Sequence, residues 1–147
     1  MLNGKDPELL IEMAPPPTHG FNINSFSTDD RDFYIWDCGG SSDYRLMWTF
    51  YYNNIDGVIF VLDAGDEGRL EESGQELVEV MTNDFLIKKP ILILAHKIDL
   101  VGAISDEYLK EYLGIKEVTD RPIRLSQSTI FRYEDIESHL LWLIRNV

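Results

Sequence analysis

The spacing of hydrophobic and polar positions changes along the chain, and each spacing predicts a different element. Residues 57–63 (GVIFVLD) and 90–95 (PILILA) are continuously apolar over the length of a strand. Such runs are typical of strands covered on both faces, as in a parallel sheet. Between the two runs, apolar or small residues recur with helical spacing and predict one helix face: Leu70, Gly74, Leu77, Val78 and Met81.

The pattern before these runs predicts a hairpin and a further helix. In residues 17–25, Phe21, Ile23 and Ser25 alternate with polar residues as in a strand. Residues 33–37 (FYIWD) form a second short strand after a polar turn, so the two strands are expected to pair antiparallel. The strongly aromatic segment 44–54 is expected to be helical.

Three more elements are predicted toward the C-terminus. Ser105 can cap a helix that runs to about Leu113, and residues 121–127 (RPIRLSQ) form a weak strand. A closing helix carries an apolar stripe: Tyr133, Ile136, Leu140, Leu143, Ile144 and Val147. Strands that alternate with helices over 147 residues indicate one domain with a right-handed, doubly wound α/β sheet.

Charge and composition narrow the classes of partner. Thirteen basic and 26 acidic residues give a net charge of −13, which disfavours nucleic acid and anionic lipid as partners. The charge suits basic protein surfaces, although an acidic soluble domain would carry it too. The single Cys38 excludes an internal disulfide framework and indicates a reducing compartment. We find no membrane-spanning run, signal-peptide core or N-myristoylation signal, and so expect no direct membrane anchor.

Candidate chemistry lies where the predicted strands end. In open α/β sheets, ligands bind outside the carboxyl ends of the strands. Asp37 follows one strand and is followed by Gly39 and Gly40, a pattern that suits a magnesium ion beside a phosphate. Asp63 ends the next strand, and residues 95–99 (AHKID) end the third with a Lys-x-Asp pair suited to a guanine edge. An Asp-x-Gly-Gly pattern also occurs in ordinary tight turns.

Taken together, these motifs and their order resemble the small GTPases of the ADP-ribosylation-factor-like (Arf-like) family, nearest its ciliary branch. The resemblance runs from about Pro17 to Val147. The segments that carry it are PTHGFNI (17–23), WDCGG (36–40), RLMWTFYY (45–52), EESGQELVEVM (71–81) and LAHKIDL (94–100).

The resemblance implies a Ras-like fold of the phosphate-loop NTPase type and assigns roles to residues. It implies that Thr18 and Asp37 are magnesium ligands and that Gly40 contacts the γ-phosphate. It implies that Lys97 and Asp99 contact guanine.

The resemblance also implies an effector surface that carries Phe21, Trp36 and Tyr51. Exposed aromatic residues are common anchors at interfaces, although these three could equally belong to a core.

Three motifs depart from the family's pattern. Ser41 stands where the family has the glutamine that orients the attacking water, and serine is too short to do so. His96 stands in place of the asparagine that begins the guanine motif. Thr129 and Ile130 align with the family's Ser-Ala, and the isoleucine is expected to crowd the base.

The family's phosphate loop, G-x-x-x-x-G-K-[ST], is also not found. Residues 3–6 (NGKD) contain Gly-Lys but lie too close to Thr18 and have Asp where Ser or Thr belongs. We therefore expect residues 1–16 to be an N-terminal extension, the tail of the first helix. Residues 17–147 are expected to form an Arf-like domain that lacks the first strand and the phosphate loop.

The missing strand would lie between residues 33–37 and 57–63. The gap would have to be closed by direct pairing of these two strands or by a strand of another chain, because unsatisfied backbone groups are costly. This requirement predicts that the protein lives in a stable assembly.

Two functions remain open on the sequence alone. In the first, the chain is a non-hydrolysing pseudo-GTPase, a scaffold for protein partners in a cytoplasmic, ciliary or cytoskeletal complex, and no cofactor is expected. In the second, it is a GTP-binding switch and GTP hydrolase that uses GTP or GDP with magnesium, and its N-terminal segment is missing from the sequence.

Overall fold

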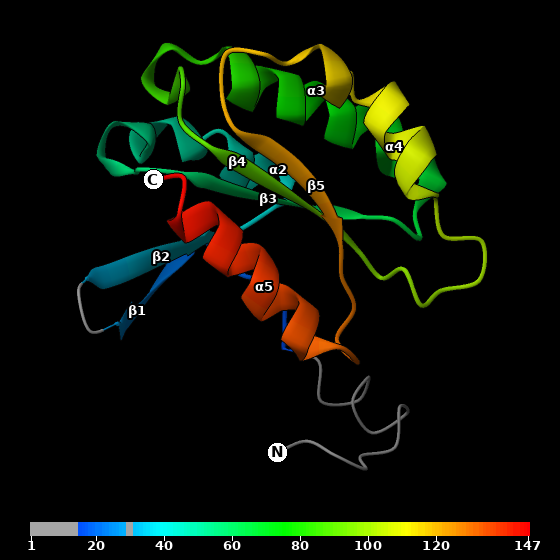
Figure 1. The fold of residues 1–147 in the computed structure, drawn as a ribbon, viewed down its shortest axis with the longest axis horizontal. Helices are drawn as coiled ribbons and strands as arrows, with labels where there is room; N and C mark the ends of the chain where they lie inside the picture. The colour runs from blue at the N-terminus through cyan, green and yellow to red at the C-terminus, as the bar shows by residue number, and fades with distance from the viewer. Residues whose placement is uncertain (1–14, 29–30) are drawn as a thin grey trace. The chain divides into compact units, whose positions relative to one another are not determined.

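The computed structural model describes residues 15–28 and 31–147, which form strands and helices in two parts of the chain, 1–51 and 52–147 (Figure 1). Most of the predicted N-terminal extension, residues 1–16, lies outside the described residues.

The first part contains the predicted antiparallel hairpin. Strand β1 (Phe21–Ser27) pairs with β2 (Asp32–Cys38), in a register that runs from Phe21 opposite Cys38 to Ser27 opposite Asp32. Because side chains alternate between the faces of a strand, Phe21, Ile23 and Trp36 share one face of the hairpin. Every residue of β1 is exposed, so this strand buries none of its apolar side chains among the described residues.

The prediction of one helix over residues 44–54 is wrong. The segment instead contains a single helical turn, α2 (Ser42–Arg45), and two short 3-10 turns, η1 (Trp48–Phe50) and η2 (Tyr52–Asn54). Consecutive aromatic residues lose side-chain freedom in a helix, and asparagine competes for backbone hydrogen bonds. Both effects favour short, tight turns over a continuous α-helix.

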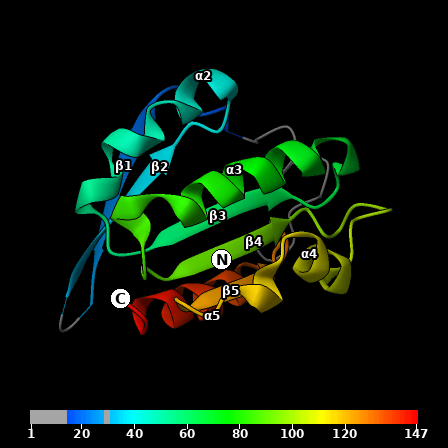
Figure 2. The same cartoon turned by 90° about the horizontal axis from the view of Figure 1, so that it is seen from above.

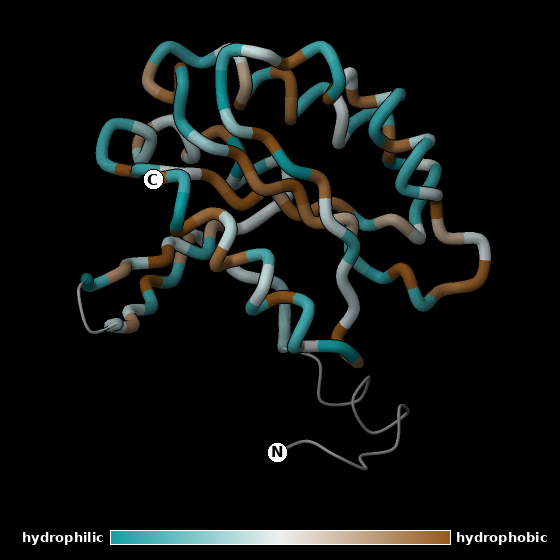
Figure 3. Tube along the Cα trace, in the orientation of Figure 1, coloured by the Kyte–Doolittle hydropathy of each residue, from teal (hydrophilic) through white to brown (hydrophobic). Residues whose placement is uncertain are grey.

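The second part contains the predicted parallel sheet. Strands β3 (Val58–Asp63), β4 (Ile91–His96) and β5 (Ile123–Gln127) pair in the order β3-β4-β5. Residues 91–95 of the central strand β4 are all buried, as their continuous apolar run predicts. Figure 3 shows this run as the apolar middle of the second part.

Strand β3 lies at the edge of the parallel sheet. Strand β2 pairs with β1 and β3 pairs with β4, in two separate sheets. Within the described ranges, β3 therefore has a strand on one side only. Val61 in its middle is 60% exposed.

Helices cover both faces of the parallel sheet. Helix α3 (Leu70–Thr82) and helix α4 (Asp106–Tyr112) lie on one side and α5 (Tyr133–Ile144) on the other (Figures 1 and 2). Short 3-10 turns complete the second part: η3 (Glu67–Arg69), η4 (Asp84–Leu86) and η5 (Ile115–Glu117). No helix that the structure describes has the length and apolar character needed to cross a membrane.

The core confirms most of the predicted helix faces and corrects one position. In α3, Leu70, Leu77 and Val80 are buried, but Val78 is 52% exposed. A residue next to Leu77 is rotated by about 100° around the helix and so leaves the buried stripe, whereas Val80, three positions on, remains in it.

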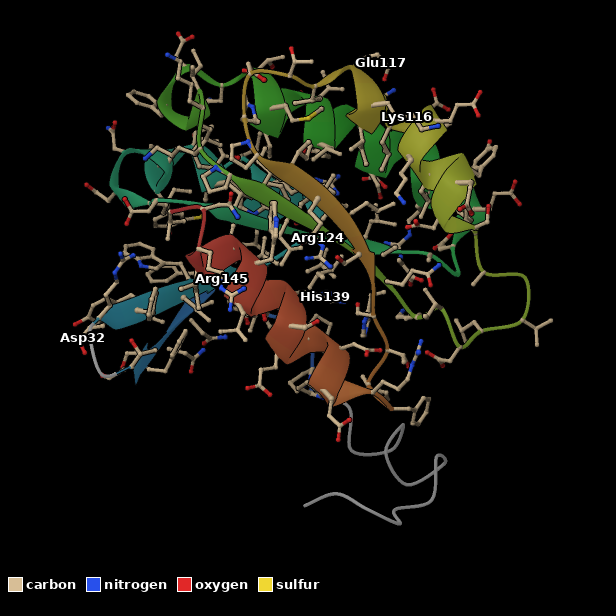
Figure 4. All side chains as sticks on the ribbon, viewed as in Figure 1. Asp32, Lys116, Glu117, Arg124, His139 and Arg145 are labelled. Atoms are coloured by element: carbon tan, nitrogen blue, oxygen red, sulfur yellow. The ribbon has the colours of Figure 1, made fainter. Side chains whose placement is uncertain are left out.

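The closing helix packs on the central strand as its stripe predicts. Leu143 of α5 forms a buried cluster with Leu92 and Leu94 of β4, and Trp142 packs against it. The guanidinium of Arg124 on β5, labelled in Figure 4, lies 5.9 Å from the centre of the Trp142 ring. Val147 is 43% exposed, so the predicted stripe ends before the last residue.

The neighbouring positions Leu77 and Val78 provide a matched test of this core. Leu77→Ala removes a side chain with no exposed surface, so we expect it to lower the free energy of unfolding by about 2–5 kcal/mol. Val78→Ala, on the exposed side of the same helix, should change it by less than about 0.5 kcal/mol. Urea denaturation followed by circular dichroism measures both. Equal losses would contradict the assignment of the buried face.

Candidate nucleotide site

The residues expected to handle nucleotide fall into two groups, a first half in the part with the hairpin and a second half in the part with the parallel sheet. The first half lies where the hairpin begins and ends. The hydroxyl of Thr18 donates a hydrogen bond to Oδ2 of Asp37, with 3.1 Å between the two oxygens. The antiparallel register explains this contact, because it places the start of β1 beside the end of β2. The structure thus brings together the two residues expected to bind magnesium.

Gly39 allows the chain to approach itself closely at this point. Its amide donates to the carbonyl of Gly20 at 2.8 Å, and its carbonyl accepts from the indole Nε1 of Trp48 at 3.0 Å. A Cβ atom at position 39 would lie 2.5 Å from the carbonyl oxygen of Thr18 and 2.9 Å from the ring of Tyr44. Only glycine fits here without a shift of the backbone.

Gly40 and Ser41 are held differently. The carbonyl of Gly40 accepts from Nη1 of Arg45 at 3.2 Å, and a Cβ atom at Gly40 would meet nothing within 4 Å. Ser41 is the exposed N-cap residue of α2, and its hydroxyl makes no capping hydrogen bond. Its carbonyl accepts from the amides of Tyr44 and Arg45. The backbone of Ser41 is therefore fixed while its short side chain faces solvent.

Cys38 lies between Asp37 and Gly39 in the sequence, but its thiol takes no part in the chemistry expected of the site. Its thiol is half-buried and lies 3.8 Å from the carbonyl oxygen of Trp36. Burial, and then the neighbouring Asp37 carboxylate, raise the pKa of the Cys38 thiol above its ordinary value. A raised pKa keeps the thiol protonated at neutral pH, so Cys38 is a poor nucleophile.

The second half of the site lies at the carboxyl ends of the parallel strands. The register places Asp63 opposite His96, directly before Lys97. Lys97 adopts a left-handed backbone conformation, with φ of 64°, and its Nζ lies 2.5 Å from Oδ2 of Asp63. The other oxygen of Asp63 accepts from the amide of Gly65 at 2.9 Å. Asp63, to which the sequence assigned no particular role, thus holds the predicted guanine-contacting lysine.

The loop after β5 contributes the remaining residues of the second half of the site. The buried Thr129 donates its hydroxyl hydrogen to Oδ1 of Asp99 at 2.5 Å. Nδ1 of His96 lies 3.0 Å from the hydroxyl of Ser128, which is 1% exposed. Ile130 follows with 54% of its surface exposed. His96, Asp99 and Thr129 are thus brought together, and Ser128 is the partner that the sequence did not reveal.

These residues fit the binding of a guanine nucleotide in part. The Asp99 carboxylate has two oxygens, and Thr129 occupies one, so the second suits the N–H donors of a guanine edge. The Thr18 hydroxyl and the Asp37 carboxylate are the oxygen ligands that magnesium prefers, and this ion keeps several waters besides. Among the described residues, no group of three or more His, Cys, Asp or Glu is placed to hold a metal by itself. Ser41 offers no group long enough for the role of the family's glutamine.

The three residues predicted to form the effector surface pack against one another. The ring centre of Phe21 lies 5.8 Å from that of Trp36 and 5.1 Å from that of Tyr51, and the last two are 5.0 Å apart. Phe21 is 42% exposed, and the other two are half-buried. We call these three residues the aromatic cluster.

Comparisons with known proteins identify the family. Residues 8–147 match the ADP-ribosylation factor family. ADP-ribosylation factor-like protein 3 of Chlamydomonas reinhardtii is 34% identical over 131 residues, which cover 89% of this chain and 74% of that protein. The protein of the same description from Caenorhabditis elegans is 36% identical over 132 residues, covering 89% of this chain and 72% of that protein.

A solved structure shows the same fold. It is the Arl6 BBS3 small GTPase of Trypanosoma brucei with a bound nucleotide analogue, GppNp, which is 27% identical to this chain. The match has a TM-score of 0.76 and covers 91% of this chain and 85% of the other. The chain therefore belongs to the ADP-ribosylation factor family, is an Arf-like small GTPase by descent and has the Ras-like α/β fold.

Gly39 and Gly40 provide a matched test of the first half of the site. Gly39→Ala forces its new Cβ into the Thr18 carbonyl, so we expect the loop to shift and stability to fall by about 1–3 kcal/mol. Gly40→Ala, with open space around it, should change stability by less than about 0.5 kcal/mol. Amide chemical shifts of Thr18 and Asp37 should move in the first variant only. Similar shifts in both variants would show that the close approach at Gly39 is not what holds this loop.

Proposed function

We propose that this chain is an Arf-like interaction module that does not hydrolyse GTP and that acts on other proteins within a stable assembly. The assembly is a ciliary or cytoskeletal one, in line with the branch of the family that the sequence resembles. The observation that carries the proposal is Ser41, whose short, exposed side chain occupies the position of the water-orienting glutamine.

The second half of the candidate site, at the carboxyl ends of the parallel strands, supports the same proposal. His96 replaces an asparagine, and its Nδ1 lies within hydrogen-bond distance of the hydroxyl of Ser128. The exposed Ile130 stands where the family has alanine. Either change alone is compatible with a working GTPase. Together with Ser41, they describe a site in which three separate nucleotide-handling positions have changed, and we therefore expect no tightly bound cofactor.

The hairpin supports action through protein partners. Within residues 15–28 and 31–51, Gly39 is the one buried residue, and every residue of β1 is exposed. An isolated hairpin is marginally stable in water, so this one gains most from a partner that covers it. The aromatic cluster offers rigid rings with partly exposed faces, the kind of side chain that dominates binding energy at interfaces.

A second candidate function is that of a switch that binds GTP and GDP with magnesium. The contact between Thr129 and Asp99 supports it, since this contact fixes one oxygen of the carboxylate that the family resemblance assigns to guanine. The pairing of Thr18 with Asp37 is also compatible with a magnesium site. Ser41 would make such a switch slow to hydrolyse GTP without help from a partner.

Turnover of GTP by the native protein separates the two functions. The protein is isolated from its own cells, and its N-terminus is read by mass spectrometry. We expect its release of phosphate from GTP to stay at buffer background, because Ser41 cannot orient water. Calorimetry should show no sub-micromolar binding of GTP or GDP. Turnover that Asp37→Ala abolishes would overturn the proposal, and tight binding without turnover would favour the second function. Ser41→Gln is the matched variant, because rescue of turnover would locate the defect at this position.

Association through the aromatic cluster is testable with Trp36. Trp36→Ala removes the largest ring of the cluster, so we expect partner binding to weaken at least about thirtyfold, as truncation of an aromatic anchor at an interface typically costs about 2 kcal/mol or more. Quantitative mass spectrometry of the proteins captured by the tagged chain in its own cells measures this change.

The control for this test is the exposed Glu117 of η5, labelled in Figure 4, whose change to alanine should leave capture unchanged. Trp36→Phe should retain most binding, because it keeps a ring in the cluster. Unchanged capture by a Trp36→Ala protein with a wild-type circular dichroism spectrum would show that the docking surface lies elsewhere.

A further inference from the structure

Strand β3 presents one side of its backbone at the edge of the parallel sheet. The amide of Val58 donates to the carbonyl of Pro90, just before β4, at 3.0 Å. The backbone groups of a strand point alternately to its two sides, so the amides and carbonyls of Ile59 and Val61 point away from β4. No strand in the described ranges of the chain pairs with that side, and Figure 2 shows β3 as the outer strand of the second part.

The side chains of β3 leave apolar surface beside this edge. On one face of the strand, Phe60 and Leu62 are buried. On the other face, Ile59 packs against the buried cluster that Leu143 of α5 forms with β4, but Val61, two positions further on, is 60% exposed. Helix α5 therefore covers the start of β3 and leaves its middle open. A strand added at the edge would lie beside Val61 and continue this apolar surface.

The features that usually protect an edge strand do not occur in this stretch. Residues 58–62 contain neither a charged residue nor a proline. Their pairing with β4 runs one residue to one residue, from Val58 opposite Ile91 to Asp63 opposite His96, so this strand carries no bulge. Natural edge strands are typically blunted by lysine, proline or a bulge. The composition of β3 is instead that of a strand with a neighbour on both sides.

The backbone groups and the charges around the edge define the class of occupant. Amides and carbonyls spaced along a strand are matched by another extended chain, as in strand addition. Asp56 before β3 and Glu67 after it are exposed, and Arg69 forms an ion pair with Asp66 at 2.7 Å. Two such edges, each in a chain with a net charge of −13, would repel each other. A strand with lysine or arginine at its ends complements the acidic residues at both ends of β3.

We propose that the edge of β3 binds, by strand addition, an extended segment of a partner protein that is rich in β-branched residues and has basic residues at its ends. This inference rests on the proposed role of the chain in an assembly, and it names the chemistry of one partner. The edge is a separate docking surface from the aromatic cluster. Its test involves neither GTP turnover nor Trp36, so its failure is distinguishable from failure of the proposed function.

Amide hydrogen exchange of the full chain, followed by NMR, tests whether the edge is open. We expect the amides of Ile59 and Val61 to exchange at least about tenfold faster than those of Phe60 and Leu62, which face β4. The probe is a seven-residue peptide in which valine and threonine alternate between terminal lysines. Saturation with this peptide should slow exchange at Ile59 and Val61 at least about tenfold. Slow exchange of both amides in the chain alone would overturn the proposal, because the edge would already be covered.

Matched peptides separate strand addition from general attraction to an acidic protein. N-methylation of the three central amides of the probe keeps its side chains and charge but removes the donors. It should weaken binding, measured by fluorescence anisotropy, at least about tenfold. Glutamates in place of the terminal lysines should weaken binding at least about fivefold at low salt. No binding of the lysine-ended peptide, or equal affinity for it and either matched peptide, would overturn the proposal.

Variants at Val61 test the edge from the side of the protein. Val61→Pro removes an amide hydrogen that points away from β4, which an edge strand tolerates, so peptide binding should fall at least about tenfold. Val61→Thr keeps the β-branched shape and the amide, and should change the affinity less than about twofold. A circular dichroism spectrum like that of the wild type shows that each variant is folded. Equal affinities of the two variants would overturn the proposal, as would a dimer in sedimentation that Val61→Pro dissociates, since the occupant would then be a second copy.

Discussion

The burial of strand β4 is the constraint on which the second part of the molecule depends. Residues 91–95 are buried without interruption, so any slip in their pairing with β3 or β5 would misplace a full set of apolar side chains. The fixed register determines where the strands end. It sets Asp63 opposite His96 and brings the loop that carries Ser128 and Thr129 to the same edge. The polar contacts at this edge of the sheet are consequences of this packing.

The first part is ordered by other means. Its described residues bury almost nothing, and what fixes them is a set of local contacts, among them the pairing of Thr18 with Asp37, the close approach at Gly39 and the aromatic cluster. Contacts of this kind between exposed groups are individually weak. The contrast separates a part with a buried apolar core from a part that is held by local polar and aromatic contacts.

Much of this arrangement could be predicted from the sequence, for physical reasons that are specific to each element. The continuous apolar runs predicted β3 and β4, since such runs are typical of strands covered on both faces, and Ser105 predicted the start of α4. Helical spacing wrongly placed Val78 on the buried face of α3, because an apolar residue can lie at the margin of a helical stripe and still face solvent. The helix predicted over residues 44–54 failed because aromatic content says little about whether one long helix or several short turns will form.

For the candidate site, the sequence motifs proposed residues but not their contacts. Motif order singled out Thr18, Asp37, Lys97, Asp99 and Thr129, and the structure adds the direct contacts between Thr18 and Asp37 and between Asp99 and Thr129. The sequence motifs could not indicate that Asp63 holds Lys97 or that Ser128 lies against His96, because each contact joins residues more than 30 positions apart. Such pairs follow from strand register, which no local pattern encodes.

The exposed edge of β3 has a consequence for the life of the protein in a cell. The segment Val58–Leu62 is apolar, rich in β-branched residues and free of proline and charge, which is the composition that templates further strands. Quality-control proteases and chaperones recognise such uncovered segments, and small shifts in the uncovered fraction change steady-state protein levels several-fold. We therefore expect a chain segment or partner that pairs with β3 to raise the abundance of the chain as well.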